Sequence, residues 1–521
     1  MPRPSSSTAK AIARRIRSIS DLQLDSQSII AASRLQPSKT FNISKPAKSL
    51  HVRAVAHRSA THQKSGQPER NAGGRGEALS EAERDEARLA RHEAEGLGRA
   101  DLLTQALARE NLVRAWKRVK ANRGSAGVDG LTVQETGGYL KVNWPRIKEQ
   151  LQSGSYRPQP VRRVQIPKSG GGLRELGIPT VTDRLIQQAL LQVMQARIDP
   201  TFSEHSYGFR PGRRAHDAVL QAQRHVQEGW QMVVDVDLEK FFDRVNHDVL
   251  MDRLSKRFDS QGIDGKAVLR LIRRYLEAGI MDGGVVTERG VVTERYEGTP
   301  QGGPLSPLLA NVLLDEVDRE LERRGHRFVR YADDCNVYVR SHKAGERVLA
   351  GLRKLYDRLH LKVNEAKSAV ARAFGRKFLG YSLWVAPGRV VKRAVARKAL
   401  DTYKQRIRKI TRRSGGRSLS EVAEQLRLYM PGWKAYFQLA QTPGIFRELD
   451  EWLRHRLRAM QLKHWQRGTT IYRELRKLGA SPDQAARVAG NARRWWHNSR
   501  LELNRIMPIA YFDRLGVPRL S

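Results

Sequence analysis

Residues 327–340 read RFVRYADDCNVYVR, and this stretch contains two strand-forming runs joined by a short polar link. Apolar, β-branched and aromatic residues dominate both runs, while Asp333 and Asp334 lie in the link. This pattern predicts a β-hairpin with two carboxylates at its tip. Adjacent acids beside apolar strands repel each other unless solvent, a cation or a basic partner offsets their charge. A metal site and a solvated turn are therefore both open at this point.

A second pair of acids follows another strand-forming run, closer to the N-terminus. Residues 232–234 (MVV) are typical of a buried strand, and the two-residue period of a strand places Asp235 and Asp237 on one face at its end. Either acid would bring a third carboxylate to the hairpin, which is the arrangement that holds two Mg²⁺ ions for phosphoryl transfer. Spacing alone does not choose between them. Phe242 follows Phe241, and a ring beside a nucleotide site excludes a ribose 2′-hydroxyl by its volume, although paired phenylalanines are also common in protein cores.

The charge of the chain indicates a polyanionic partner. Its 95 Lys and Arg residues outnumber 54 Asp and Glu residues, which gives a formal net charge of +41 over 521 residues. Nucleic acid explains this surplus better than an anionic membrane, because no apolar run approaches the ~18 residues of a membrane-spanning helix. Cys335 is the only cysteine, which excludes an intramolecular disulfide and a zinc site built from cysteine pairs.

Two glycine-containing segments have the character of ligand-binding loops. Glycines at 170–172 separate two strand-like runs, with Lys168 before them and Arg174 after them. Glycines let a ligand approach the backbone closely, and two flanking cations suit a triphosphate; an ordinary hairpin with basic residues is the alternative. In the second segment, Gln301 and two glycines precede a helix opened by prolines. The buried stripe expected for that helix is Leu308, Leu309, Val312, Leu313 and Val317.

Seven motifs occur in a fixed order between residues 102 and 384. They are IPKSGGGLRELGIPT, YGFRPGRRAHDA, VDVDLEKFFD, GTPQGGPLSPLLANVLLDE, YADD, LKVNEAKS and FLGY. In this order they resemble the motifs of the reverse transcriptases encoded by group II introns. A lone YADD would be a weak match, whereas seven motifs in the correct order are not expected by chance.

The resemblance implies an α+β fold of the right-hand polymerase type. Fingers and palm would span residues 97–388, with the palm built as an antiparallel sheet that carries helices on one face. Residues 389–521 would form an all-α thumb and maturase-specific (X) domain. Residues 1–96 are expected to be a basic, largely disordered extension, because residues 1–75 contain only three acids and no sustained apolar period.

By resemblance, Asp237, Asp333 and Asp334 are catalytic residues and metal ligands, and together they would hold two Mg²⁺ ions. Asp237 is preferred to Asp235 because Phe242, five residues further on, matches the ring with which the family excludes ribonucleotides. Asp235 is then a structural acid. The reaction would be attack of a DNA primer 3′-hydroxyl on the α-phosphate of a deoxynucleotide, with RNA as the template.

The resemblance also assigns residues to the incoming deoxynucleoside triphosphate and to the leaving group. Lys168 and Arg174 would hold the triphosphate. Gln301 and Gly302 would lie along the nascent base pair. Lys367 is a candidate to protonate the leaving pyrophosphate, so it counts among the expected catalytic residues.

Beyond residue 384 the chain becomes strongly basic. Residues 391–413 contain ten Lys and Arg residues against one acid, Asp401, and are expected to form a helix that binds phosphates. The segment PGWKAYF at 431–437 resembles the family's maturase-specific motif. The implied partners are group II intron RNA, a DNA primer, target DNA and deoxynucleoside triphosphates, with no membrane. The implied location is the bacterial cytoplasm, as a ribonucleoprotein with the intron RNA, and import into an organelle is a minor alternative.

Many family members continue into an HNH-type endonuclease with cysteine pairs around a metal, and the single Cys335 leads us to expect a short type without that domain. Two other functions stay open. One is a reverse transcriptase of another bacterial system, such as diversity-generating or CRISPR-linked enzymes, which would not be expected to carry PGWKAYF. The other is a non-catalytic splicing factor that kept only the RNA-binding fold, and the three aspartates argue against it.

Overall fold

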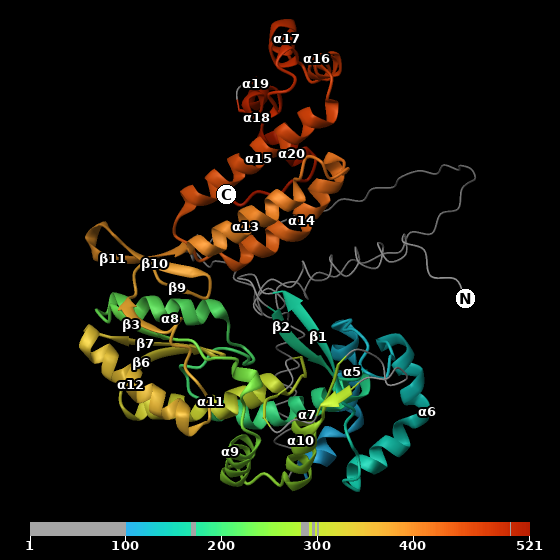
Figure 1. The fold of residues 1–521 in the computed structure, drawn as a ribbon, viewed down its shortest axis with the longest axis vertical. Helices are drawn as coiled ribbons and strands as arrows, with labels where there is room; N and C mark the ends of the chain where they lie inside the picture. The colour runs from blue at the N-terminus through green and yellow to red at the C-terminus, as the bar shows by residue number, and fades with distance from the viewer. Residues whose placement is uncertain (1–100, 168–172, 283–290, 294–296, 300–301, 501) are drawn as a thin grey trace, which may run out of the picture. The chain divides into compact units, whose positions relative to one another are not determined.

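The computed structural model describes residues 101–521, apart from 168–172, 283–290, 294–296, 300–301 and 501 (Figure 1). The N-terminal extension expected at 1–96 lies outside the described residues. Buried apolar side chains form two main cores, one from residues 102–363 and one from residues 403–520. Strands and helices alternate in the first part and helices alone follow from Arg397, which confirms the expected α+β class with a helical C-terminal region.

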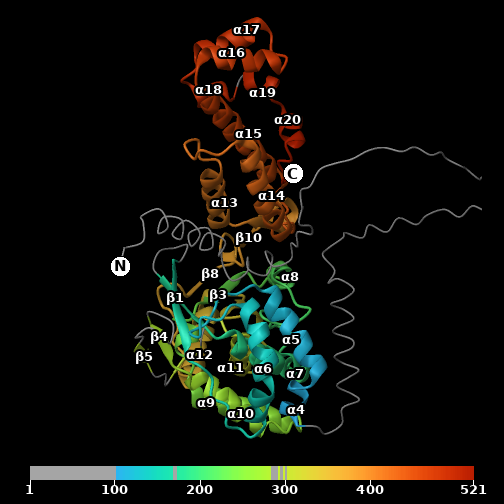
Figure 2. The ribbon, with the colours of Figure 1, turned by 90° about the vertical axis from the view of Figure 1, so that its right-hand side faces the viewer.

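Helices and a mixed sheet make up the part expected to be the fingers. Its helices are α4 (Leu102–Ala106), α5 (Arg109–Ala121), α6 (Val133–Gln152) and α7 (Val181–Ile198), followed by the short helix η1 (Asp199–Thr201). Its strands are β1 (Val161–Pro167), β2 (Leu173–Ile178), β4 (Ile280–Asp282) and β5 (Val291–Thr293), in the order β2-β1-β4-β5. The two strand-like runs predicted on either side of residues 170–172 are β1 and β2, which are antiparallel neighbours (Figure 1), while the glycines themselves lie outside the described residues. Figure 2 shows β4 and β5 on the same side of the molecule as β1, with which β4 pairs.

A buried acid fixes the base of this hairpin to the helices. The carboxylate of Asp183, in the first turn of α7, accepts hydrogen bonds from the Tyr156 hydroxyl at 2.8 Å and from the Gln159 backbone N–H at 3.3 Å. Thr180 caps the same helix by accepting from the Asp183 N–H at 3.0 Å. Since a buried carboxylate is costly without partners, these donors tie the chain before β1 firmly to α7.

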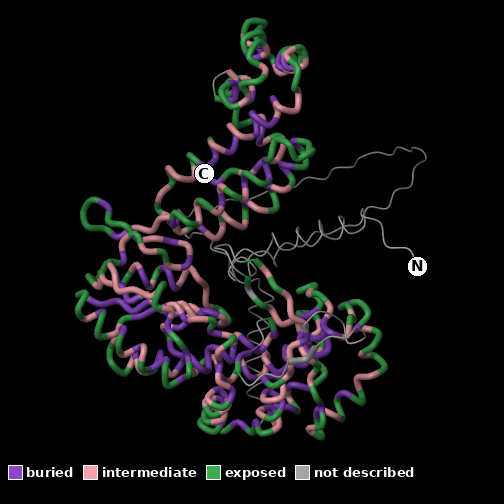
Figure 3. The backbone as a smooth tube through the Cα atoms, in the orientation of Figure 1, coloured by how far each residue is buried: buried purple, intermediate pink, exposed green. Residues whose placement is uncertain are grey.

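A four-stranded antiparallel sheet forms the expected palm, in the order β6-β7-β3-β8. Its strands are β3 (Met232–Val236), β6 (Arg327–Tyr331), β7 (Asp334–Val339) and β8 (Ala369–Arg372). The accompanying helices are α8 (Ala215–Gln227), α9 (His247–Ser260), α10 (Lys266–Glu277), α11 (Ser306–Arg323) and α12 (His342–Arg358). The stripe expected on the helix after Gln301 is confirmed, since all five of its apolar residues are buried in α11. Buried and intermediate residues run through the palm strands in Figure 3.

The two faces of the palm sheet are both covered. Val234 and Val337 belong to the core shared with α11 and α12, whereas Val233 and Tyr338 pack with α8 on the other face. Figure 1 shows α8 on the opposite side of the sheet from α11 and α12. The expectation of helices on one face is therefore wrong. Apolar residues occupy consecutive positions in β3, so both faces need a cover.

The basic segment 391–413 begins as a strand and not as a helix. A small antiparallel sheet contains β9 (Lys377–Phe378), β10 (Tyr381–Ala386) and β11 (Val390–Val395), and η3 (Pro387–Arg389) joins the last two strands. β11 contains three valines, which favour a strand, and the helix starts only at Arg397. The domain boundary predicted at 388/389 falls inside this hairpin, whose strands pair across it.

The C-terminal region consists of helices around their own apolar core. They are α13 (Arg397–Ile410), α14 (Leu419–Tyr436), α15 (Pro443–Trp465), α16 (Gly468–Lys477), α17 (Pro482–Gly490), α18 (Trp495–Asn498), α19 (Glu502–Ile506) and α20 (Ile509–Arg514). Ser418 begins α14 in a capping box: its hydroxyl accepts from the Glu421 N–H, and the Glu421 carboxylate accepts from the Ser418 N–H at 2.7 Å. Trp433, from PGWKAYF, packs against the buried ring of Tyr403 with the centroids 4.5 Å apart.

Candidate active site

The hairpin β6–β7 and the end of β3 bring the predicted acids together. Tyr331 pairs with Asp334 across a two-residue turn, so Asp333 lies at the tip and the predicted hairpin is confirmed. β3 runs antiparallel to β7, and Val236 is the last paired residue of β3. Continuing the register by one residue places Asp237 beside Asp334. The site thus combines acids from two neighbouring strands that are nearly a hundred residues apart in the sequence.

Asp334 is strongly affected by its surroundings. Burial raises the pKa of its carboxyl to about 7, with further upward contributions from the charges of Asp333, Asp235 and Asp237 and an opposing one from Lys377. An acid with a raised pKa disfavours its charged form, because both desolvation and like charges penalise the carboxylate. The acids at this end of the sheet therefore repel each other, and a cation would relieve that repulsion.

Asp237 is partly exposed and is held by the segment 364–368. Its backbone carbonyl accepts from the Asn364 N–H at 2.8 Å, and its N–H donates to the Ser368 hydroxyl at 3.0 Å. The Lys367 ammonium donates to Asp237 Oδ2 at 3.0 Å, while 66% of the lysine side chain remains exposed. The predicted catalytic lysine thus lies beside the predicted metal ligands, and in this state it neutralises one of them.

Asp235 has a different environment from Asp237. Arg376 donates to Asp235 Oδ2 from Nη2 at 2.6 Å and from Nε at 3.2 Å. A guanidinium stays protonated, so it neutralises the carboxylate that it binds. This geometry gives Asp235 a structural partner, and the choice of Asp237 as the metal ligand stays a prediction.

The structure describes the surroundings of two predicted nucleotide-binding residues, Phe242 and Gly302. Phe242, in the short helix η2 (Phe241–Asp243), is half-buried and packs edge-on against Phe241, with centroids 5.1 Å apart. Gly302 is exposed with φ of 128°, and a Cβ there would lie 2.8 Å from the Gly177 carbonyl oxygen. Position 302 therefore requires glycine, because its φ is positive and because a side chain would collide with β2.

The remaining nucleotide-binding predictions have no described side chain. Lys168, the glycines 170–172 and Gln301 lie outside the described residues. Arg174 is described only by its backbone, which pairs with Ile166 in the β1–β2 register.

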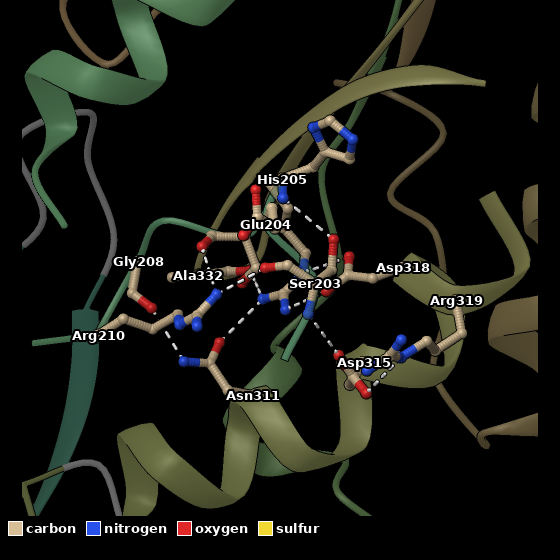
Figure 4. Close-up of polar contacts among 12 residues, drawn as sticks. Ser203, Glu204, His205, Gly208, Arg210, Asn311, Asp315, Asp318, Arg319 and Ala332 are labelled. Atoms are coloured by element: carbon tan, nitrogen blue, oxygen red, sulfur yellow. Dashed lines mark hydrogen bonds and ion pairs between the residues drawn. The ribbon is translucent and has the colours of Figure 1, made fainter. Parts of the chain in front are cut away.

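Sequence reasoning missed a buried polar group behind the hairpin. Arg330, the last but one residue of β6, has a fully buried side chain that forms an ion pair with the equally buried Asp318 of α11. Asn311, on the same helix, accepts a hydrogen bond from Arg330 Nη1 at 2.9 Å. Asn311, Asp318 and Ala332 appear around the same group of polar contacts in Figure 4. The available signals were an arginine inside an apolar strand and two polar residues seven positions apart on the apolar side of a helix.

The described residues contain no group of three or more His, Cys, Asp and Glu side chains arranged to hold a metal ion. The acids nonetheless lie close enough to influence each other's charge, as the pKa of Asp334 indicates. Within the same part of the chain, no helix is both long and apolar enough to cross a membrane.

Comparison with known families places these features in context. Residues 166–383 match the reverse transcriptase (RNA-dependent DNA polymerase) family, and residues 400–479 match the group II intron maturase-specific domain. The chain thus contains a region similar to reverse transcriptases, followed by a region similar to group II intron maturase domains. The first region contains the three predicted metal ligands and Lys367, and the second contains the PGWKAYF segment.

Proteins similar to this chain occur in bacteria and in yeast. Protein YkfC of Escherichia coli (strain K12) is 38% identical over 202 residues, which cover 38% of this chain and 50% of YkfC. The group II intron-encoded protein LtrA of Lactococcus lactis subsp. cremoris is 32% identical over 252 residues, 48% of this chain and 40% of LtrA. The putative COX1/OXI3 intron 1 protein of Saccharomyces cerevisiae is 28% identical over 264 residues, 49% of this chain and 29% of that protein. The chain thus aligns with half or less of the length of these relatives.

Proposed function

We propose that this protein is an RNA-directed DNA polymerase that reverse transcribes a group II intron RNA and assists its splicing and mobility. The observation that supports the polymerase activity is the register of the palm sheet. It places Asp237, at the end of β3, beside Asp334 of the β6–β7 hairpin, with Asp333 adjacent at the tip. These acids lie inside the region that matches the reverse transcriptase family. The substrates would be deoxynucleoside triphosphates, a DNA primer and an RNA template, with target DNA as the source of the primer.

The same three acids are proposed to hold two Mg²⁺ ions. Charge supports the fit, because burial and neighbouring acids raise the pKa of Asp334 to about 7 and a divalent cation would offset that repulsion. Bound there, Mg²⁺ would stabilise the charge that develops on the reacting phosphate. Lys367 has to leave the Asp237 carboxylate before that oxygen becomes available, since the ammonium bonds to it at 3.0 Å.

Other residues of the chain would then act on the nucleotide. Lys367, once released from Asp237, is placed to donate a proton to the leaving pyrophosphate. Phe242 would exclude ribonucleotides by the volume of its ring. Lys168 and Arg174 would hold the triphosphate.

Gln301 and Gly302 are proposed to lie along the nascent base pair. Gly302 fits this position because a side chain there would collide with the backbone at Gly177, 2.8 Å from the Cβ position. The backbone at Gly302 is exposed, so a ligand can approach it closely.

The C-terminal helices would bind the intron RNA through a surface that we call the basic face. It consists of two tryptophans covered by cations: Trp452 with Arg408 and Arg456, and Trp495 with Arg413 and Lys463. Burial and the charges of Arg408 and Arg413 lower the pKa of Arg456, so the face carries like charges that repel each other. RNA phosphates would offset these charges, and aromatic rings flanked by arginines suit unstacked bases. We place the resulting ribonucleoprotein in the bacterial cytoplasm.

Primer extension on an RNA template with Mg²⁺ and deoxynucleotides tests the polymerase activity. The wild type should extend a DNA primer, and Asp333→Ala should not, because one of the three acids is missing. The assay should be run at matched protein concentration, with the folded state of both proteins checked by circular dichroism. No extension by the wild type would leave the non-catalytic splicing factor as the better explanation.

Splicing of the cognate intron tests the second activity separately. Removal of residues 391–521 should abolish protein-assisted splicing, whereas Asp333→Ala should retain it, because RNA binding does not need the acids. Splicing that is unaffected by the truncation would favour a reverse transcriptase of another bacterial system. Target DNA and nascent products can be followed in the same reactions.

A further inference from the structure

The guanidinium of Arg330 donates hydrogen bonds to three residues, Asp318, Asn311 and Ala332. Its Nε donates to Asp318 Oδ1 at 2.8 Å, so the charge is offset by an acid on α11. Its Nη1 donates to Asn311 Oδ1 and to the backbone carbonyl of Ala332, both at 2.9 Å. Ala332 is the residue directly before Asp333. The guanidinium therefore reaches from the helix under the sheet to the turn that carries the acids.

The loop 203–210 supports the same turn from the other side. The Arg330 N–H donates to the His205 carbonyl at 2.9 Å, and the Arg330 carbonyl accepts from the Tyr207 N–H at 2.8 Å. Asn311 Nδ2 donates to the Gly208 carbonyl at 2.9 Å. A Cβ on Gly208 would lie only 2.2 Å from the Ala332 nitrogen, so the two backbones touch. His205, Gly208, Asn311 and Ala332 are labelled together in Figure 4.

Ala332 needs such support because of its backbone. Its φ is 58°, in the left-handed region, which is unfavourable for a residue with a Cβ. Strain of this kind persists where the surroundings hold the residue in place, and it is found most often at functional sites. A carbonyl fixed by a buried guanidinium is such a restraint.

Stability alone does not account for the buried pair. Both Arg330 and Asp318 have side chains with 0% exposure, and burying an ion pair costs desolvation that its attraction often fails to recover. A well-packed apolar pair would be equally stable or more so. A role in fixing the geometry of the turn gives the pair a function that apolar residues lack.

We propose that Arg330, held by Asp318 and Asn311, is a positioning residue that fixes the Ala332 carbonyl and thereby sets Asp333 and Asp334 for metal binding. This inference rests on the proposed function of those two acids. Groups that orient metal ligands typically contribute 10–100-fold to metal affinity. Removing the hydrogen bond to Ala332 should therefore weaken binding of a divalent cation more than it weakens the fold.

The test measures Mn²⁺ binding to the full-length protein by electron paramagnetic resonance of free Mn²⁺, with Mg²⁺ as competitor. Arg330→Lys keeps a charge for Asp318 but cannot form the forked hydrogen bonds to Asn311 and Ala332. Asp450→Asn is the matched control: Asp450 is buried on α15 and binds Arg454 and the backbone N–H of Leu520, both in the C-terminal region. Urea unfolding of each variant measures the cost to the fold.

We expect Arg330→Lys to raise the Kd for Mn²⁺ by about tenfold or more. Asp450→Asn should bind Mn²⁺ like the wild type even if it loses as much stability. Asn311→Ala, which keeps the ion pair, should weaken Mn²⁺ binding as well, and it decides the question if Arg330→Lys does not fold. Unchanged Mn²⁺ binding in the folded Arg330 and Asn311 variants would overturn the proposal, as would equal weakening in the Asp450 control.

The same measurements separate this proposal from the proposed function. The wild type could bind Mn²⁺ through Asp333 and Asp334 and still fail to extend primers. That result would reject the polymerase activity, and the Arg330 and Asn311 variants would still decide the positioning role. A wild type that binds no Mn²⁺ at these acids would overturn the positioning role itself.

Discussion

At the scale of a single residue, the ionised carboxyl of Asp334 destabilises the folded protein. Burial, together with the charges of nearby acids, raises its pKa to about 7. The folded protein therefore binds more protons than the unfolded chain between about pH 4 and pH 7, and the contribution of this group to stability falls as the pH rises through that window. Above pH 7 the metal-free protein bears the whole cost, on the order of 1–4 kcal/mol from the change in pKa.

We predict that Asp334→Asn stabilises the metal-free protein at pH 8, because the amide removes a buried charge. The gain should be smaller at pH 5, where the wild-type carboxyl is largely protonated, and it should shrink when Mg²⁺ is added at pH 8. Urea unfolding in the presence of a chelator and then of Mg²⁺ measures each value. Asp259→Asn, at an exposed position of α9, is the control. A destabilised Asp334→Asn protein at pH 8 would contradict the prediction.

At the scale of elements, the hairpin β6–β7 depends on the loop that lies against its turn. Gly208→Ala would place a Cβ 2.2 Å from the backbone nitrogen of Ala332, so the loop or the turn has to move. We expect a loss of about 1–3 kcal/mol of stability and a larger proportional loss of primer extension. Gly138→Ala in α6, where nothing lies within 4 Å of the new Cβ, should be neutral or stabilising. Thermal unfolding and extension assays, run on both variants, decide the prediction, which fails if Gly208→Ala extends primers normally.

The elements also show what the sequence could reveal and what it could not. The hairpin, the α11 stripe and the capping box at Ser418 follow local rules, because alternation, helical spacing and caps are legible over a few residues. The charge of segment 391–413 favours one basic helix, yet its first residues form β11, where Val391 and Val395 pair with Val385 and Tyr381 of the neighbouring strand β10. Charge alone does not separate a strand from a helix there. Arg330 escapes local rules for another reason, because its partners Asp318 and Asn311 lie on α11.

At the scale of the whole molecule, the acids proposed for the chemistry and the basic face proposed for RNA binding belong to regions with different apolar cores, one formed by residues 102–363 and one by residues 403–520. Replacing Arg408 and Arg456 of the basic face with Gln should weaken binding to the intron RNA without reducing extension of a short primer and template. Fluorescence anisotropy measures the association constant for RNA over a range of salt concentrations. The slope of its logarithm against the logarithm of the salt concentration should be smaller in magnitude by about one for each RNA phosphate that the variant no longer neutralises.

The control for the basic face removes the same charge elsewhere in this region. Arg473 and Arg487 are exposed and pair with Glu474 and Glu502, and their replacement with Gln should leave the affinity for intron RNA nearly unchanged. An equal loss in both double variants would mean that only the net charge of the molecule matters.

The rate of the first deoxynucleotide addition to a DNA primer on an RNA template tests the central claim most directly. It compares Asp237→Asn with Asp235→Asn, two acids on one face of the same strand end, of which Asp235 is bound by Arg376 and Asp237 lies beside the hairpin. We predict that Asp237→Asn lowers this rate on the order of a thousandfold, which corresponds to about 4 kcal/mol, and that Asp235→Asn stays within about tenfold of the wild type. Equal rates for the two variants, or normal extension by Asp237→Asn, would contradict the assignment of the active site.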